Sequence, residues 1–315
     1  MPNSVTSIGN YCFYRCTNLQ EVNIPNSVTE IGAFALSRCT SLISATIPNS
    51  VSKMSEGVFR HDANLRVVNL PDSITTLGIN CFHNCTSLVE INIPNSVTSI
   101  GNYCFQSCTS LEEISIPNSV TEIGIYALSK CTSLKRVNIS NNVTVLEQGL
   151  LEQDTSLVEV NLPDSLISVG TFSFRWCSSL EEINLPDSVV SICNEAFNQC
   201  SSLRSVNLPR SLKTIERMSF CGLHLSSLPE FPDGIEYIGD SAFQNVPTAG
   251  TIQLPDSIKE IGECAFGGCN YMTINLPSTV ETVGVNAFQY AGHLYYNGSL
   301  PEAPWGAYYW NGVKQ

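Results

Sequence analysis

The chain has 315 residues, a net charge of −13 and a pI near 4.7, and 14% of its residues are charged. This balance argues against binding of nucleic acid or of an anionic membrane surface, and the low charged fraction excludes a disordered acidic tail. No apolar run is long enough to span a bilayer, so no membrane insertion is expected. Met1 is followed at once by a repeat, without a signal peptide or a capping unit, so the chain is expected to be truncated.

A 23-residue motif fills the chain, and in Pro94–Ile116 it reads PNSVTSIGNYCFQSCTSLEEISI. With its proline as position 1, the motif occurs thirteen times; Ser140 replaces one proline, and Pro277 falls one residue early. A fixed period of this length predicts a repeat solenoid of about 13 turns rather than two globular domains. We expect the solenoid to occupy residues 1–294 and an aromatic-rich cap or tail to occupy residues 295–315.

Three groups of positions predict the elements of each turn in order. Val at position 4 and Ile at position 7, as in Val97 and Ile100, predict a short extended segment that a glycine ends. Small or apolar residues at positions 11, 12 and 15 would share one face of a helical turn, which predicts a short helix or 3-10 segment. Apolar positions 21 and 23 alternate with polar ones, which predicts a strand with one face inward, ended by the next proline.

The fourteen cysteines follow the same columns. Most lie at position 15 or at position 11, where other turns have alanine. A cysteine that exchanges with alanine is a small core residue, so buried free thiols are favoured. Pairing stays open for Cys12 with Cys16, Cys81 with Cys85 and Cys104 with Cys108, which are neighbours in sequence. The spacing does not match a structural zinc site, so no metal or other cofactor is predicted.

The chain has grown by copying a block of four turns. Pro2–Ile24 and Pro94–Ile116 share 17 of 23 residues, and the third and seventh turns both replace the column cysteine with an acid, Asp62 and Asp154. Unpaired acids are costly in a core, so both are expected to point to solvent; a catalytic role is the alternative. Pro229 falls inside an expected strand and predicts a bulge or a broken ladder.

The consensus LxxIxIPxSVTxIGxxAFxxCxSL resembles the leucine-rich repeat of the BspA-like class, also called the Treponema pallidum type, from Pro2 to about Leu294. Phenylalanine at position 12, present in ten turns, is a specific part of this motif. The resemblance implies a right-handed, α/β-type solenoid with a parallel β-sheet on its concave face. It also implies a surface or secreted protein of a bacterium or of a parasitic or commensal protist, and several members are implicated in adhesion.

The outward positions of the expected strand carry the candidate site. Position 22 is mostly asparagine, which is expected to form hydrogen bonds along the sheet, whereas positions 19 and 20 are largely charged. The candidate partner-binding residues are Glu21, Glu90, Glu112, Glu113, Arg136, Glu159, Glu181 and Glu182. Glutamates stacked about 5 Å apart repel one another, so this stripe favours a basic partner or a cation, with a merely solvated face as the alternative.

No catalytic constellation is recognisable, because the serines lie in repeated corners and no phosphate-binding loop is present, so an enzyme is not predicted. We predict a non-enzymatic cell-surface or secreted adhesion module that recognises a protein or glycan partner through the concave sheet. The alternative is a structural scaffold or spacer in a larger assembly, which could be intracellular. The aromatic residues from Tyr295 to Trp310 are expected to cap the core, with a sugar-binding platform as the alternative.

Overall fold

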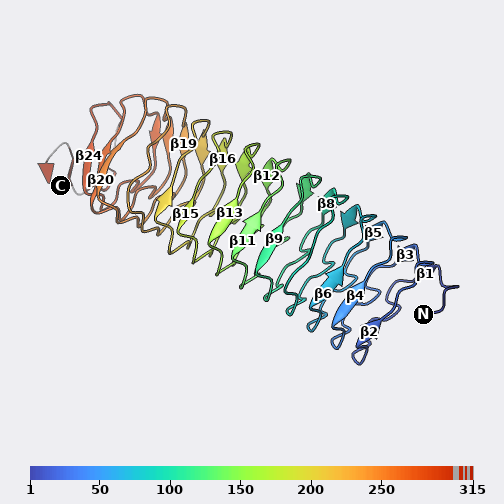
Figure 1. Ribbon diagram of the computed structural model, residues 1–315. Helices are drawn as coiled ribbons and strands as arrows, with labels where there is room; N and C mark the ends of the chain where they lie inside the picture. The colour runs from blue at the N-terminus through green and yellow to red at the C-terminus, as the bar shows by residue number, and fades with distance from the viewer. Residues whose placement is uncertain (301–304, 308, 311–312, 315) are drawn as a thin grey trace. The chain divides into compact units, whose positions relative to one another are not determined.

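The structure is a computed structural model that describes residues 1–300, 305–307, 309–310 and 313–314. It divides into two compact units, Met1–Pro163 and Asp164–Gln315. The turns of each unit stack in sequence order, as Figure 1 shows, and every described element is a strand or a turn. Each unit is therefore a β-solenoid with parallel sheets, as the repeat predicts.

In the first unit, each turn contributes short strands to two rows, except the fourth turn, whose Glu90 forms only an isolated bridge in the second row. The row at positions 6 and 7, which we call the threonine sheet, consists of β1 (Ser7–Ile8), β3 (Glu30–Ile31), β5 (Lys53–Met54), β7 (Thr76–Leu77), β8 (Ser99–Ile100), β10 (Glu122–Ile123) and β12 (Val145–Leu146). The row at positions 20 to 22, which we call the acidic sheet, consists of β2 (Glu21–Val22), β4 (Ser44–Thr46), β6 (Val67–Asn69), β9 (Glu113–Ser115), β11 (Arg136–Asn138) and β13 (Glu159–Asn161). Pairing is parallel and joins equal positions of successive turns; Val137, for example, pairs with Ile114 and Val160.

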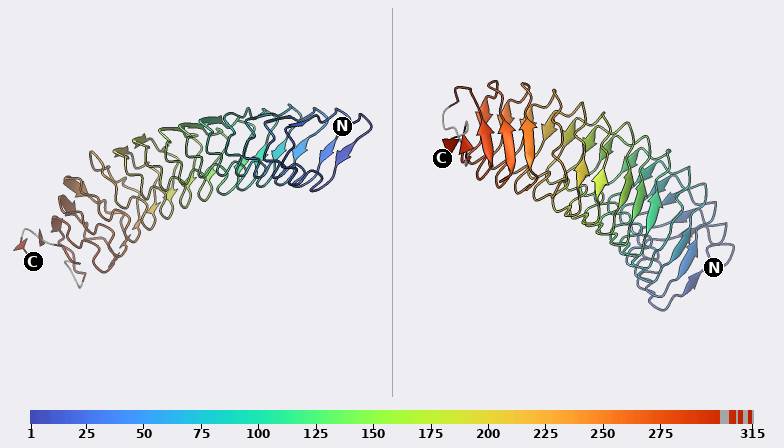
Figure 2. Two further views of the ribbon diagram at one scale, coloured as in Figure 1. Left: turned by 90° about the horizontal axis from the view of Figure 1, so that it is seen from below. Right: turned by 60° about the vertical axis from the view of Figure 1, so that its left-hand side comes forward.

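The second unit repeats this arrangement with one interruption. Its first row consists of β14 (Ser168–Val169), β16 (Ser191–Ile192), β18 (Thr214–Ile215), β19 (Tyr237–Ile238), β21 (Glu260–Ile261) and β23 (Thr282–Val283). Its second row consists of β15 (Glu182–Ile183), β17 (Ser205–Val206), β20 (Gly250–Gln253), β22 (Met272–Asn275) and β24 (His293–Tyr295). No strand forms around Pro229, between β17 and β20, which confirms the broken ladder predicted there. The right-hand view of Figure 2 shows β20, β22 and β24 side by side beyond that break.

The core of each unit contains a ladder of phenylalanine rings from position 12. Phe82 and Phe105 stack with ring centroids 5.2 Å apart and planes 3° from parallel, and Phe174 and Phe197 stack at 5.1 Å. These four rings are fully buried. Because the turn spacing is set by the parallel sheets, each ring meets the next at van der Waals distance, which is the offset stacking that aromatic pairs favour.

The column cysteines fill the core beside this ladder, and all fourteen thiols are free. Each buried thiol at position 15 that has a phenylalanine one turn earlier donates a hydrogen bond to that residue's carbonyl oxygen. The Sγ of Cys108 lies 3.2 Å from the Phe82 oxygen, and that of Cys200 lies 3.0 Å from the Phe174 oxygen. Burial raises the pKa of the Cys200 thiol to about 12, so it carries no thiolate at neutral pH. Cys12 and Cys16 are exposed exceptions in the first turn.

The prediction of a helical segment at positions 11 to 15 is wrong, because the described residues contain no helix there. In each turn, the residues at positions 10 and 14 have positive φ, such as 57° at Tyr103 and 61° at Ser107. The intervening Phe105 donates its N–H to the Ala127 oxygen of the next turn at 2.8 Å rather than along the chain. Two left-handed residues in five break an α-helix, and the hydrogen bonds between turns replace the helical ones.

At Gly57 and Gly149, glycine at position 10 lets the aromatic ring of the preceding turn lie against the backbone. Gly149 has a φ of 62°, and a Cβ added there would collide with the ring of Tyr126. We expect Gly149→Ala to lower the free energy of unfolding by about 2 kcal/mol, because it adds a clash to an unfavourable φ. Urea unfolding measures this loss. Gly9→Ala is the matched control, since a Cβ at Gly9 meets nothing within 4 Å; equal losses in the two variants would contradict the prediction.

The C-terminal cap stays a proposal, with support from the described part of the tail. Trp305 is buried, and its ring lies 6.2 Å from that of Phe288 and 5.4 Å from that of Tyr296. The backbone of β25 (Tyr309–Trp310) pairs with β24, and β26 (Val313–Lys314) pairs with β25. The remaining tail residues, including Tyr308, lie outside the described residues.

Candidate functional site

The eight predicted site residues are all exposed, and the sheets sort them into two groups. The acidic sheet of the first unit carries six of them: Glu21 in β2, Glu90 opposite Val67, Glu112 and Glu113 at β9, Arg136 in β11 and Glu159 in β13. The second unit carries Glu181 and Glu182 at β15. The alternation of inward and outward positions, which the sequence shows clearly, accounts for this exposure.

Ion pairs between turns neutralise the middle of the acidic stripe. Lys135 Nζ lies 2.8 Å from a carboxylate oxygen of Glu112, and Arg136 pairs with Glu113. The hydrogen bond from Lys135 and the positive charge of that residue hold the pKa of the Glu112 carboxyl below its usual range. Within the described residues Glu21, Glu90 and Glu159 form no ion pair, so they are the uncompensated charges of the stripe in the first unit; Glu181 and Glu182 form none in the second.

A hollow of about 430 Å³ lies on the acidic sheet, where Val67, Glu90 and Glu113 line it from three successive turns. Asn69, Asn92 and Ser115 also line it. The position-22 side chains form hydrogen bonds between turns, as predicted for this column. Beside the hollow, Asn138 Nδ2 donates to Ser115 Oγ at 2.9 Å. The hollow can accept hydrogen bonds from a cationic group through its carboxylates, and its walls have no nucleophile activated by a base.

Sequence reasoning missed an apolar flank beside this hollow. Ile43 and Val89, both at position 19, are 52% and 41% exposed. They line a second hollow of about 500 Å³ together with Gln20, Asn64 and Arg66. The sequence shows these apolar residues at an outward position, but position 19 is charged in other turns, so the apolar flank was not recognised.

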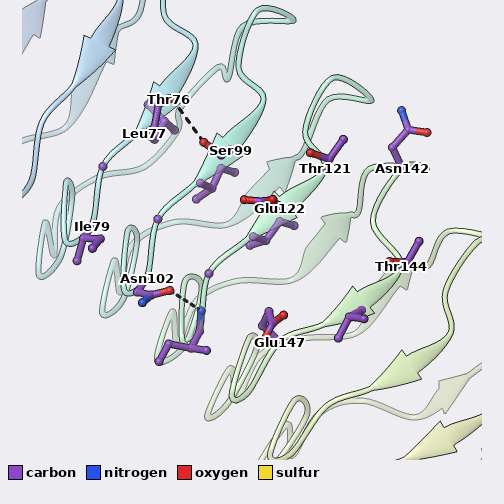
Figure 3. Close-up of a pocket in the computed structure, with 17 residues that line it drawn as sticks. Thr76, Leu77, Ile79, Ser99, Asn102, Thr121, Glu122, Asn142, Thr144 and Glu147 are labelled. Carbon is purple, nitrogen blue, oxygen red and sulfur yellow. Dashed lines mark hydrogen bonds between the residues drawn. The ribbon is translucent and has the colours of Figure 1, made fainter.

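A third hollow, of about 750 Å³, lies on the threonine sheet and is shown in Figure 3. Its polar side chains are mostly engaged between turns: Asn102 Oδ1 accepts a hydrogen bond from the Ile125 N–H at 3.1 Å, and the Thr121 hydroxyl donates to the Thr98 oxygen. Glu122 and Glu147 line the same hollow. Because its hydroxyl and amide groups already stabilise the stack, this hollow is a weaker candidate than the acidic sheet.

Asp62 and Asp154 do not point to solvent, so that expectation is wrong; both are fully buried. One oxygen of Asp62 accepts the Cys39 N–H at 2.8 Å, and one oxygen of Asp154 accepts the Cys131 N–H at 2.8 Å. The second carboxyl oxygen of each residue finds no partner among the described residues. Burial raises the pKa of Asp62 to about 9, so the carboxyl is neutral at pH 7 and takes the place of the column thiol.

The part of the chain that the structure describes contains no cluster of three His, Cys, Asp or Glu side chains arranged to hold a metal ion. Nor does any helix within it have the length and apolar character of a membrane span.

Comparison with known proteins identifies the family of the repeat. A family model described as "BspA type Leucine rich repeat region (6 copies)" matches residues 1–85, 55–180 and 167–295. A leucine-rich repeat protein from Bacteroides ovatus aligns with a TM-score of 0.62 and 24% identity, over 94% of this chain and 91% of that one. A leucine-rich cell surface protein from Faecalibacterium prausnitzii aligns with a TM-score of 0.54 and 27% identity, over 80% and 81%. The pneumococcal vaccine antigen PcpA aligns with a TM-score of 0.55 and 19% identity, over 92% and 79%. No match was found among curated proteins.

Proposed function

Because the chain belongs to the BspA-type leucine-rich repeat family, we propose that it is a non-enzymatic adhesion module, secreted or displayed on a cell surface, that binds a protein partner. No catalytic family is among the matches. The likeness to the Faecalibacterium prausnitzii cell surface protein supports the location. The same family assignment confirms the resemblance drawn from the motif.

The observation that carries the binding proposal is the joint exposure of acidic and apolar side chains on one sheet. Glu21 and Glu90 carry uncompensated charge, and Ile43 and Val89 are large exposed apolar side chains on the turn after Glu21 and on the turn of Glu90. A patch of this kind suits a partner that offers basic side chains around apolar ones, because the apolar contacts supply affinity and the charges supply orientation and association rate. We therefore place the binding surface on the acidic sheet of the first unit.

The double substitution Glu21→Gln and Glu90→Gln tests this surface. We expect it to weaken binding to a basic extracellular-matrix protein about tenfold, because two uncompensated contacts are lost at about 1 kcal/mol or less each. A panel of immobilised matrix proteins, probed with the whole chain by surface plasmon resonance, identifies the partner and measures the loss.

The matched control is the double substitution Glu30→Gln and Glu122→Gln, which changes the net charge equally but lies on the threonine sheet. It is expected to bind as the unchanged protein does. The proposal fails if both doubles lose the same affinity, or if no matrix or cell-surface protein binds the chain at all.

A scaffold or spacer role is the second candidate, and the free thiols favour it. The buried cysteines are unoxidised and bonded to backbone oxygens, an arrangement compatible with a reducing compartment. A spacer would be recovered from its native extract within a stable assembly, whereas an adhesion module would be recovered alone and would bind its partner on contact.

A further inference from the structure

The cationic side chains of the first unit differ in whether they pair with an acid. On the acidic sheet, Lys135 and Arg136 each pair with a glutamate. In contrast, no ion pair within the described residues involves the cations at positions 13 and 14 of the first six turns. Together with two histidines they form what we call the cationic row: Arg15, Arg38, Arg60, His61, His83 and Lys130.

The backbone holds the cationic row in register. Arg15 N–H donates to the Ser37 oxygen at 2.9 Å, Arg38 N–H to the Arg60 oxygen at 2.9 Å, and His61 N–H to the His83 oxygen at 2.8 Å. Successive turns are therefore spaced at about 4.8 Å, as in a parallel sheet. Arg15, Arg38 and Lys130 are exposed. The row thus presents positive charges on the first, second, third and sixth turns, along the stacking direction of the unit.

The centre of the row is arranged as a group of donors. The rings of His61 and His83 lie 5.3 Å apart at 78°. Asn84 Nδ2 lies 3.0 Å from His61 Nδ1, so the amide donates to that nitrogen and the histidine proton lies on Nε2. Arg60 Nε and His83 Nδ1 are enclosed and find no hydrogen-bond partner among the described residues. Because neither atom reaches the surface, the exposed charges of the row are those of Arg15, Arg38 and Lys130.

The acid nearest in sequence does not compensate the row. Asp62 follows His61 directly, but its side chain is fully buried and its raised pKa, about 9, keeps it uncharged at neutral pH. Burial and the charges of Arg38 and Arg60 lower the pKa of His61, so the two arginines dominate the local field. A positive surface is therefore maintained on a chain whose net charge is −13.

We propose that the cationic row binds a sulfated polysaccharide. Guanidinium groups form paired, charge-assisted hydrogen bonds with oxyanions, which favours sulfate groups that recur along a chain. The row is narrow and linear, so it fits a single flexible polyanion. Duplex nucleic acid would bring its remaining charges against the acidic surfaces of the protein, and an anionic membrane requires a broad basic face. This surface goes beyond the proposed function, since it occupies a different segment of each turn from the acidic sheet.

The test measures binding of a heparin oligosaccharide to the whole chain by titration calorimetry over a series of salt concentrations. The triple substitution Arg15→Gln, Arg38→Gln and Lys130→Gln removes three exposed charges. We expect it to weaken binding at least tenfold and to reduce the slope of log affinity against log salt by about two, since each lost contact with a single-stranded polyanion contributes about 0.7. The triple substitution Lys53→Gln, Arg66→Gln and Arg204→Gln is the control, because it changes the net charge equally outside the row; we expect less than a twofold effect.

Each other outcome overturns the inference. Equal losses in the two triples would show attraction by net charge alone. Equal binding of desulfated heparin would remove the role of sulfate, and tighter binding of a single-stranded oligonucleotide would assign the row to nucleic acid. Unchanged thermal unfolding of both triples establishes that they are folded. Binding of a matrix protein through the acidic sheet is expected to survive the row substitutions, so the two proposals fail independently.

Discussion

Replacing Phe105 by alanine is expected to lower the free energy of unfolding by about 3–5 kcal/mol. The ring is fully buried and lies between the turns before and after it, stacked at 5.2 Å on Phe82 and hydrogen-bonded through its backbone to Ala127. A repeat unit cannot relax around the lost volume without separating turns that the parallel sheets hold together, so a cavity remains. Urea unfolding of the variant, followed by circular dichroism, measures the loss.

The control is Phe105→Leu, because the same column accommodates leucine at Leu36, Leu128 and Leu151. We expect this variant to lose about 1 kcal/mol, since most of the buried volume is kept. If leucine and alanine destabilised the protein equally, the stacking of the aromatic rings rather than the filled volume would be the source of the stability, contrary to the prediction.

Apolar periodicity predicts most of the buried side chains of this protein, although it did not predict the burial of Asp62 and Asp154. Phe105, Cys108 and Ile114 are inward because their columns stay apolar in turn after turn, and burial depends on that average property. The backbone between them was not predictable in the same way. Tyr103 and Ser107 adopt positive φ although neither residue type favours it, because the hydrogen bonds between turns impose that conformation. A helical interpretation therefore follows naturally from one repeat and fails once repeats are stacked.

In the candidate site, too, some features follow from sequence periodicity and others depend on contacts between turns. The exposure of Glu90 and Glu113 follows from strand alternation, and the pairing of Lys135 with Glu112 follows from their equal positions in adjacent turns. The hollow beside Val67 depends on the volumes of several side chains from different turns, so no single motif predicts it. The cationic row was hidden for a similar reason, since its members alternate between two positions and skip the fifth turn.

The burial of Asp62 and Asp154 has the largest consequence for the pH dependence of stability. The folded state keeps the Asp62 carboxyl protonated up to a pKa of about 9, whereas the unfolded chain releases that proton near its ordinary value of 3.8. Between these values the folded state binds more protons than the unfolded state, so stability is fully present below about pH 4 and falls as the pH rises. The loss is about 1.4 kcal/mol for each pH unit and for each such carboxyl. Asp154, whose pKa burial also raises, adds a loss in the same direction.

The double substitution Asp62→Asn and Asp154→Asn is expected to flatten this dependence. An amide oxygen still accepts the Cys39 N–H and the Cys131 N–H, but nothing titrates, so the variant gains stability over the unchanged protein by several kcal/mol at pH 8 and by little at pH 4. Unfolding by urea at each pH measures the two slopes. The exposed Asp72→Asn is the control and leaves the slope unchanged. Parallel slopes for the double variant and the unchanged protein would mean that water reaches the two carboxyls and that the third and seventh turns open around them.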